Sequence, residues 1–149
     1  MPKRSFISEE IENVTSSLKI PAHPLEKIEA KRLREIIYKQ YEIDSKSPGV
    51  MINSSTSSVH DPQAWSRIRE FLTDGQAILF LREWDDDELM WVFPDGESLH
   101  ECLAEAFGFV FFVTDKSASY LLAFDDHDCL IGAGRAEEWV RSLQIQKVD

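Results

Sequence analysis

Two clusters of acidic residues are the parts of this sequence whose side chains could do chemistry. Asp125-Asp126-His127-Asp128 places four titratable groups in consecutive positions, and Asp85-Asp86-Asp87-Glu88 forms a second acidic run. The first cluster has groups that could ligate a hard cation or hold a histidine for acid–base catalysis. A calcium loop needs oxygen ligands at alternating positions followed by a glycine and a distal glutamate, whereas here Cys129 begins an apolar run. We therefore interpret both clusters first as solvated hairpin turns and second as a recognition surface.

Trp84 and Trp91 flank the second acidic run, and aromatic residues beside acidic ones are common on protein-binding surfaces. The alternative is that the two indoles pack against each other across a hairpin. No residue is assigned a catalytic or metal-binding role, and no cofactor is expected. The candidate partner-binding residues are Trp84, Asp85, Asp86, Asp87, Glu88, Trp91, Asp125, Asp126, His127 and Asp128.

The signatures of common catalytic and cofactor sites are absent from the sequence. It contains no Gly-x-Ser-x-Gly nucleophile elbow, and Gly132-Ala133-Gly134 lacks the third glycine and the Lys-Ser/Thr pair of a phosphate loop. Cys102 and Cys129 do not have the paired spacing of a zinc site. We interpret both as buried thiols in a reducing compartment. These observations favour a non-enzymatic protein over an enzyme.

The net charge of −11 lies entirely in the second half of the chain. Residues 1–74 contain 11 basic and 11 acidic residues, whereas residues 75–149 contain five basic and 16 acidic ones. Direct binding to nucleic acid is disfavoured, because such affinity comes from clustered Lys and Arg. The excess negative charge is consistent with a basic protein partner and also with solubility alone. The sequence shows no signal peptide and no apolar run of membrane-spanning length, so we expect a cytoplasmic protein without membrane contact. The oligomeric state is left open.

Short apolar runs separated by polar turns predict an antiparallel sheet. The runs Phe109–Thr114, Ser119–Phe124 and Cys129–Ala133 have the length and composition of strands and predict a three-stranded meander. Gln76–Trp84 and Leu89–Phe93 predict a hairpin. The expected fold class is α+β, with an antiparallel sheet of about five strands, helices mainly on one face, and further helices preceding the sheet.

Apolar residues at helical spacing predict five helices in the same chain. We expect one domain over residues 1–149, in which residues 1–44 are a candidate helical arm and residues 45–60 a polar connection. Within that connection, Val50–Ile52 is the one short apolar piece and could add an edge strand. The predicted helices span about residues 8–18, 24–41, 61–74, 97–107 and 136–143.

The stretches Trp91–Phe93, Phe109–Asp115 and Tyr120–Asp128 resemble those of small acidic cytoplasmic proteins of bacteria, some of which are immunity proteins that neutralise a cognate toxin. The likeness covers roughly the second half of the chain and lies in acidic loops beside a meander rich in Trp and Phe. It implies a protein-binding inhibitor whose acidic surface covers the basic active site of a toxin. No role of a particular residue follows from it.

Three functional hypotheses are consistent with the sequence. The leading one is a non-enzymatic protein-binding module, most concretely an immunity-type inhibitor that binds a basic partner through the two acidic turns. The alternative is a small enzyme or metal-binding domain centred on His127 with Asp125 and Asp128. The second alternative is an adaptor whose helical arm, residues 8–43, docks on another protein or on a second copy of the chain.

Overall fold

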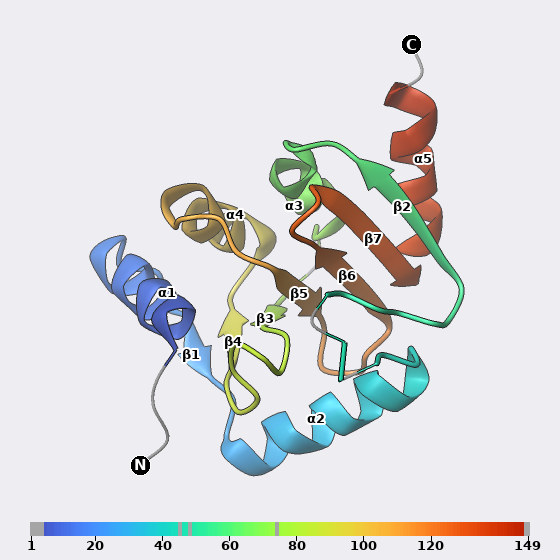
Figure 1. Ribbon diagram of the computed structural model, residues 1–149. Helices are drawn as coiled ribbons and strands as arrows, with labels where there is room; N and C mark the ends of the chain where they lie inside the picture. Colours follow the sequence, from blue (N-terminus) through green and yellow to red (C-terminus); the bar gives the residue numbers. More distant parts are fainter. Residues whose placement is uncertain (1–4, 45, 48, 74, 148–149) are drawn as a thin grey trace.

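The protein is built on a single seven-stranded antiparallel sheet (Figure 1). The structure is a computed structural model, and it describes residues 5–44, 46–47, 49–73 and 75–147. The strand order across the sheet is β1-β4-β3-β5-β6-β7-β2. The strands are β1 (His23–Pro24), β2 (Thr56–His60), β3 (Ala77–Phe80), β4 (Met90–Phe93), β5 (Phe111–Thr114), β6 (Tyr120–Phe124) and β7 (Cys129–Gly134). The helices are α1 (Phe6–Ser17), α2 (Lys27–Gln40), the 3-10 helix η1 (Ala64–Arg67), α3 (Ile68–Phe71), α4 (Gly96–Glu105) and α5 (Glu137–Lys147).

The prediction of an α+β fold built on an antiparallel sheet is confirmed. β5, β6 and β7 form the predicted meander, and β3 and β4 form the predicted hairpin. β3 pairs with β5 as well as with β4, and this pairing joins the hairpin and the meander into one sheet. In this pairing Phe80 lies opposite Phe112. This β3–β5 pairing decides which loops meet at each end of the sheet.

The predicted number of about five strands is wrong, because each edge of the sheet carries one more strand. β1 has two residues and pairs with β4 at Trp91 and Val92. β2 lies inside the predicted polar connection and pairs along its whole length with β7. An edge strand has a neighbour on one side alone, so a Ser- and Thr-rich segment can form it. Val50–Ile52 is not that edge strand: Ile52 makes a single bridge, to Ile43.

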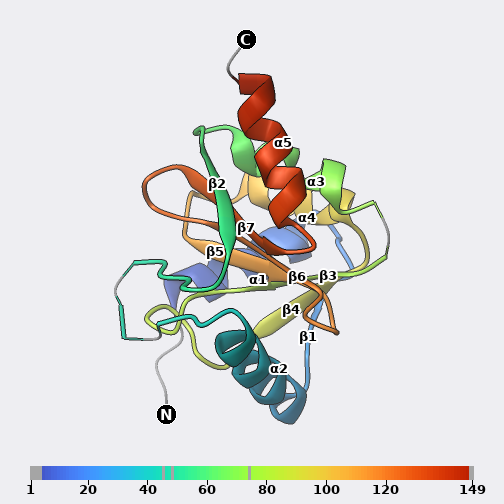
Figure 2. The ribbon, with the colours of Figure 1, turned by 90° about the vertical axis from the view of Figure 1, so that its right-hand side faces the viewer.

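Helices cover both faces of the sheet (Figure 2). One core cluster joins residues of α1, α3, α4 and α5 to one face, with Leu79, Phe93 and Leu122 from the strands. A second cluster joins α2 to the opposite face, where Ile78 and Phe80 point. The prediction of helices mainly on one face therefore holds for four helices and misses α2.

The N-terminal helices pack on the sheet rather than project from it. Ile11 of α1 and Ile37 of α2 have no exposed surface, and each lies in one of the two core clusters. None of the described helices combines the length and apolar character that a membrane span requires. The described part of the predicted helical arm, residues 5–44, thus packs with the strands in the two core clusters, and residues 1–4 lie outside the described residues.

Four predicted helices have limits in the structure that differ by one to four residues at each end, and the helix predicted for residues 61–74 does not form as one helix. α1 begins two residues earlier than the predicted residue 8, because the Ser5 hydroxyl accepts a hydrogen bond from the Ser8 amide at 3.0 Å and caps the helix. Ser8 is therefore inside the helix and fully buried. The helix predicted for residues 61–74 is replaced by the 3-10 turn η1 followed by the single turn of α3.

Candidate functional site at the acidic end of the sheet

The strand pairing brings the two acidic loops to the same end of the sheet. β3 and β6 both run antiparallel to β5, so they point in one direction. The β3–β4 loop and the β6–β7 loop therefore leave the sheet at the same end, and two strand spacings, about 10 Å, separate β3 from β6. The segment that leads from α4 into β5 enters between them (Figure 1). We call the surface formed by residues 82–89, 107–110 and 125–128 the acidic end.

In the β3–β4 loop, two of the four side chains of the acidic run Asp85–Glu88 build the loop itself. One carboxylate oxygen of Asp86 accepts hydrogen bonds from the backbone N–H groups two and three residues further on, at 2.8 and 2.9 Å. Its other oxygen accepts a hydrogen bond from the Ser8 hydroxyl of α1 at 2.6 Å. Asp85 forms an ion pair with Arg82 at 2.7 Å. Asp85 and Asp86 therefore shape the loop, and little of their charge is presented to a partner.

Arg34 of α2 fixes this loop from the other face of the sheet. Its guanidinium donates hydrogen bonds to the backbone carbonyl oxygens of Leu81 at 3.1 Å and Asp86 at 3.2 Å. It lies 5.4 Å from the centre of the Phe80 ring, within range of a cation–π interaction. The Arg34 side chain is buried, so this attachment is protected from water. The loop is thus held between α1 and α2.

The other two acids of this run share a hollow with basic residues of the protein itself. Asp87 and Glu88 line a hollow of about 450 Å³. The lining also includes the basic residues Lys27, Lys31 and Arg34 of α2, and the acidic residues Glu35 and Glu83. Attraction across this hollow reduces the negative potential that the loop presents to solvent. The predicted role of these two acids in partner binding is therefore weaker than their sequence alone indicates.

The two tryptophans have opposite environments, and Trp91 does not fit the predicted binding surface. Trp84 lies in the loop beyond β3, and 66% of its surface is exposed. Trp91 belongs to β4, between β1 and β3, and 2% of its surface is exposed. Its side chain packs in the core cluster beneath the helices. The two indoles therefore do not form the cross-strand pair that was the alternative interpretation, and only Trp84 remains available to a partner.

In the β6–β7 loop, one aspartate shapes the turn and the others point outwards. Asp125 accepts hydrogen bonds from the backbone N–H groups of His127 at 2.9 Å and Cys129 at 3.0 Å. Asp128 has a positive φ of 60°, a conformation that Asp tolerates in tight turns. The side chains of Asp126, His127 and Asp128 are exposed. This loop therefore adds two exposed carboxylates, those of Asp126 and Asp128, to the acidic end, where Glu83, Asp87 and Glu88 are exposed as well.

An apolar hollow of about 360 Å³ lies between the two loops. Its lining combines three phenylalanines with three aspartates and four further residues: Phe107, Phe109, Phe124, Asp125, Asp126, Asp128, Ile7, Arg82, Gly108 and Val110. Phe107 is 49% exposed, although it belongs to a large apolar residue type. The Glu10 carboxylate accepts a hydrogen bond from the Phe107 amide at 3.0 Å and so holds this segment against α1.

Sequence reasoning missed the part that residues 107–110 play in the acidic end. The sequence predicts a helix that ends at about residue 107 and a strand that begins at Phe109. The helix ends before Phe107, and β5 begins at Phe111, so the residues between them form a connection. The sequence signal for an exposed apolar connection was Phe107-Gly108-Phe109, because connections between elements are usually polar.

The geometry around His127 does not favour the enzymatic or metal-binding alternative. His127 is 82% exposed, and its Nε2 atom lies 3.7 Å from a carboxylate oxygen of Asp126, itself 59% exposed. Among the residues that the structure describes, no group of three or more His, Cys, Asp or Glu side chains is arranged to hold a metal ion. The imidazole and its neighbouring carboxylates lie in water, without the desolvation that strengthens electrostatic catalysis.

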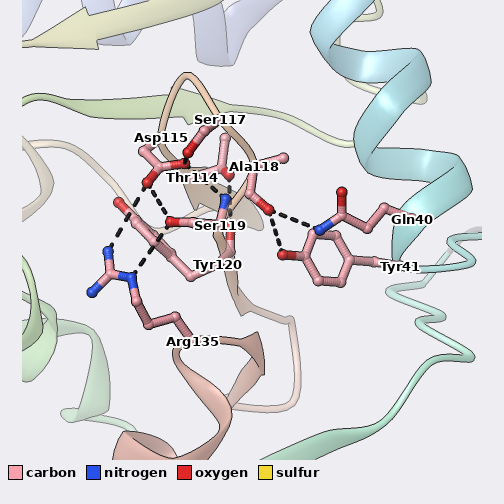
Figure 3. A network of polar contacts seen from close by, with 9 residues as sticks. All are labelled: Gln40, Tyr41, Thr114, Asp115, Ser117, Ala118, Ser119, Tyr120 and Arg135. Carbon is pink, nitrogen blue, oxygen red and sulfur yellow. Dashed lines mark hydrogen bonds and ion pairs between the residues drawn. The ribbon is translucent and has the colours of Figure 1, made fainter.

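The opposite end of the sheet carries a polar network that folds the β5–β6 loop (Figure 3). Asp115 accepts hydrogen bonds from the hydroxyl groups of Ser117, at 3.1 Å, and Ser119, and from the Ser119 amide at 2.9 Å. Arg135 of the β7–α5 turn lies 4.0 Å from Asp115. Tyr41, the C-cap residue of α2, donates a hydrogen bond of 2.6 Å to the carbonyl oxygen of Ala118. We interpret this network as structural.

Asp115 makes the stability of this loop depend on pH. Burial alone raises the pKa of Asp115, but hydrogen bonds from Ser119 and Ser117 more than offset it and hold the pKa below its usual value. Such a carboxylate stabilises the fold above its unfolded-state pKa of about 3.9, and this contribution is lost as the pH falls through the lower folded-state pKa. We expect the stability difference between the wild type and Asp115→Asn to be largest at neutral pH and to narrow below about pH 4. Urea denaturation at several pH values measures it, and a difference that is the same at every pH would contradict this assignment.

Comparisons of the chain with models of protein families, with curated proteins and with solved structures found no match. The site must therefore be interpreted from its own geometry.

Proposed function

We propose that this chain is a non-enzymatic protein-binding module, and that the acidic end is its binding surface for a basic protein. In its most concrete form, the module is an immunity-type inhibitor that acts in the cytoplasm and covers the basic active site of a toxin. Such an inhibitor needs no catalytic group, because it acts by occupying the site of its target.

The observation that supports this proposal is the position of exposed carboxylates beside an apolar hollow on a rigid scaffold. Asp126 and Asp128 supply charge next to the half-exposed ring of Phe107. Protein interfaces commonly have aromatic residues in the centre and charged residues at the rim. The aromatic centre supplies affinity, whereas the charges speed association with a basic partner and reject acidic ones. The overall charge of −11 acts in the same direction.

Native mass spectrometry of the tagged protein, recovered gently from its own cells, tests this proposal first. We expect a stoichiometric complex with a basic protein. Recovery of the chain with a bound metal ion or small molecule and no protein would contradict the proposal and favour the His127 alternative. Recovery with an acidic protein would contradict the assigned surface.

The captured partner then allows the surface to be mapped by paired variants. We expect Asp126→Asn/Asp128→Asn to weaken binding about tenfold at low ionic strength and less at high ionic strength, since salt screens exposed charges. Glu42→Gln/Glu138→Gln is the matched control, because it removes two exposed acids that lie beyond the other end of the sheet. Equal binding by the two double variants at low salt would place the interface elsewhere.

A further inference from the structure

A second hollow shares the Phe107–Phe109 segment with the hollow between the acidic loops. The second hollow has a volume of about 250 Å³, and its lining includes Trp65, Leu103 and Phe111. Both hollows share Phe107, Gly108, Phe109 and Phe124 in their linings. Phe107 and Phe109 thus line both hollows, and we call this segment the Phe107–Phe109 ridge.

The two hollows differ in the chemistry of their linings. The first has three aspartates beside its phenylalanines, whereas the lining residues given for the second carry no acidic or basic side chain. The first therefore suits a side chain with a long apolar stem and a cationic head, and the second suits an uncharged apolar side chain. Arg82 belongs to the wall of the first hollow, where its charge is balanced by the ion pair with Asp85.

Arginine fits the first hollow better than lysine does. Its planar guanidinium stacks on aromatic rings and presents two parallel N–H groups to a carboxylate, whereas the lysine ammonium is a compact and strongly hydrated charge. The protein contains this arrangement elsewhere. Arg135 lies 5.0 Å from the Phe71 ring centre and 5.1 Å from that of Tyr120, and 4.0 Å from the Asp115 carboxylate.

Resting on the proposed function, we infer that the basic partner inserts an arginine side chain into the hollow between the Phe107–Phe109 ridge and the β6–β7 loop. The stem of this arginine packs against the phenylalanines, and its guanidinium binds Asp126 and Asp128. A neighbouring apolar side chain of the partner fills the second hollow. Recognition of this kind requires an arginine and an apolar side chain next to each other on the partner. This requirement is more selective than attraction to a basic surface in general.

Two small probes test the first hollow without any partner protein. We would titrate the full chain with Nα-acetyl-arginine amide and with Nα-acetyl-citrulline amide, which has nearly the same shape and no charge, and record two-dimensional amide NMR spectra. We expect saturable shifts of the amides at residues 107–110 and 125–128, with at least about fivefold tighter binding of the arginine probe. We expect Asp126→Asn/Asp128→Asn to abolish that preference while its spectrum remains that of a folded protein.

Equal affinity for the two probes, or shifts confined to other residues, would overturn the inference. The result is independent of the proposed function, because the probes contain no partner. If a basic protein is captured from the cells and the arginine probe leaves residues 107–110 and 125–128 unshifted, the arginine pocket is wrong and the proposed function stands. If the arginine probe binds there and the chain is recovered without a basic protein, the pocket stands and the proposed function fails.

Discussion

Replacing Gly134 with alanine is expected to cost about 3 kcal/mol of the free energy of unfolding, combining backbone strain with overpacking. Gly134 ends β7 with a φ of 62°, a conformation that favours glycine. A Cβ atom there would lie 2.6 Å from the Tyr41 hydroxyl and 2.8 Å from the Ser119 carbonyl oxygen. The substitution therefore displaces the hydroxyl that binds Ala118 and disturbs the network of Figure 3.

Gly75→Ala is the matched control for this substitution. Gly75 has a similar φ of 73°, but a Cβ atom at that position meets no heavy atom within 4 Å. It should therefore cost about 1 kcal/mol, which is the backbone strain alone. Urea denaturation of the two variants measures the difference. Equal losses of stability in the two variants would contradict the close contacts of Gly134 with Tyr41 and Ser119.

Replacing Phe107 with alanine is expected to weaken partner binding at least about thirtyfold, which corresponds to about 2 kcal/mol, because aromatic residues at the centre of an interface dominate its energy. The same change should cost at most about 1 kcal/mol of stability, because half of the Phe107 surface is already exposed. The loss of stability should be larger at a core phenylalanine. Phe93 is fully buried, and Phe93→Ala should cost about 3–5 kcal/mol of the free energy of unfolding.

Ile28→Ala provides the control for an exposed apolar side chain outside the acidic end. Ile28 of α2 is 72% exposed and lines neither of the two hollows beside Phe107. Titration calorimetry with the captured partner compares the two variants. Unchanged affinity of Phe107→Ala, with the fold intact, would remove the aromatic centre from the proposed interface.

Local patterns were sufficient to predict the strands of the hairpin and the meander. β-branched and aromatic runs between turn residues correspond to β3 to β7, although with different limits. The apolar run of β3 also indicates what surrounds that strand. All four residues of β3, Ala77–Phe80, are buried, because helices cover both faces of the sheet there. A run without polar alternation is typical of a strand covered on both sides, and it could have predicted the position of α2.

The acidic end could be predicted only in part, because its make-up depends on long-range pairing and on loop conformation. Whether the two acidic turns converge depends on the pairing of β3 with β5, which neither hairpin specifies by itself. Asp86 and Asp125 resemble their neighbours in the sequence, yet both bind backbone N–H groups of their own loops. Trp91 and Trp84 likewise differ in burial because Trp91 lies on an inner strand and Trp84 in a loop.

The central claim is that the charge of the β6–β7 loop guides a basic partner to the acidic end. Its most direct test is the association rate constant of the captured partner with Asp126→Lys/Asp128→Lys, measured by stopped flow at low and high ionic strength. Glu42→Lys/Glu138→Lys makes the same change in net charge beyond the other end of the sheet and serves as the control. We predict that the first variant associates about a hundredfold more slowly than the wild type at low salt, with a much weaker dependence on salt, and that the control changes far less. Equal rates for the two variants would contradict the account.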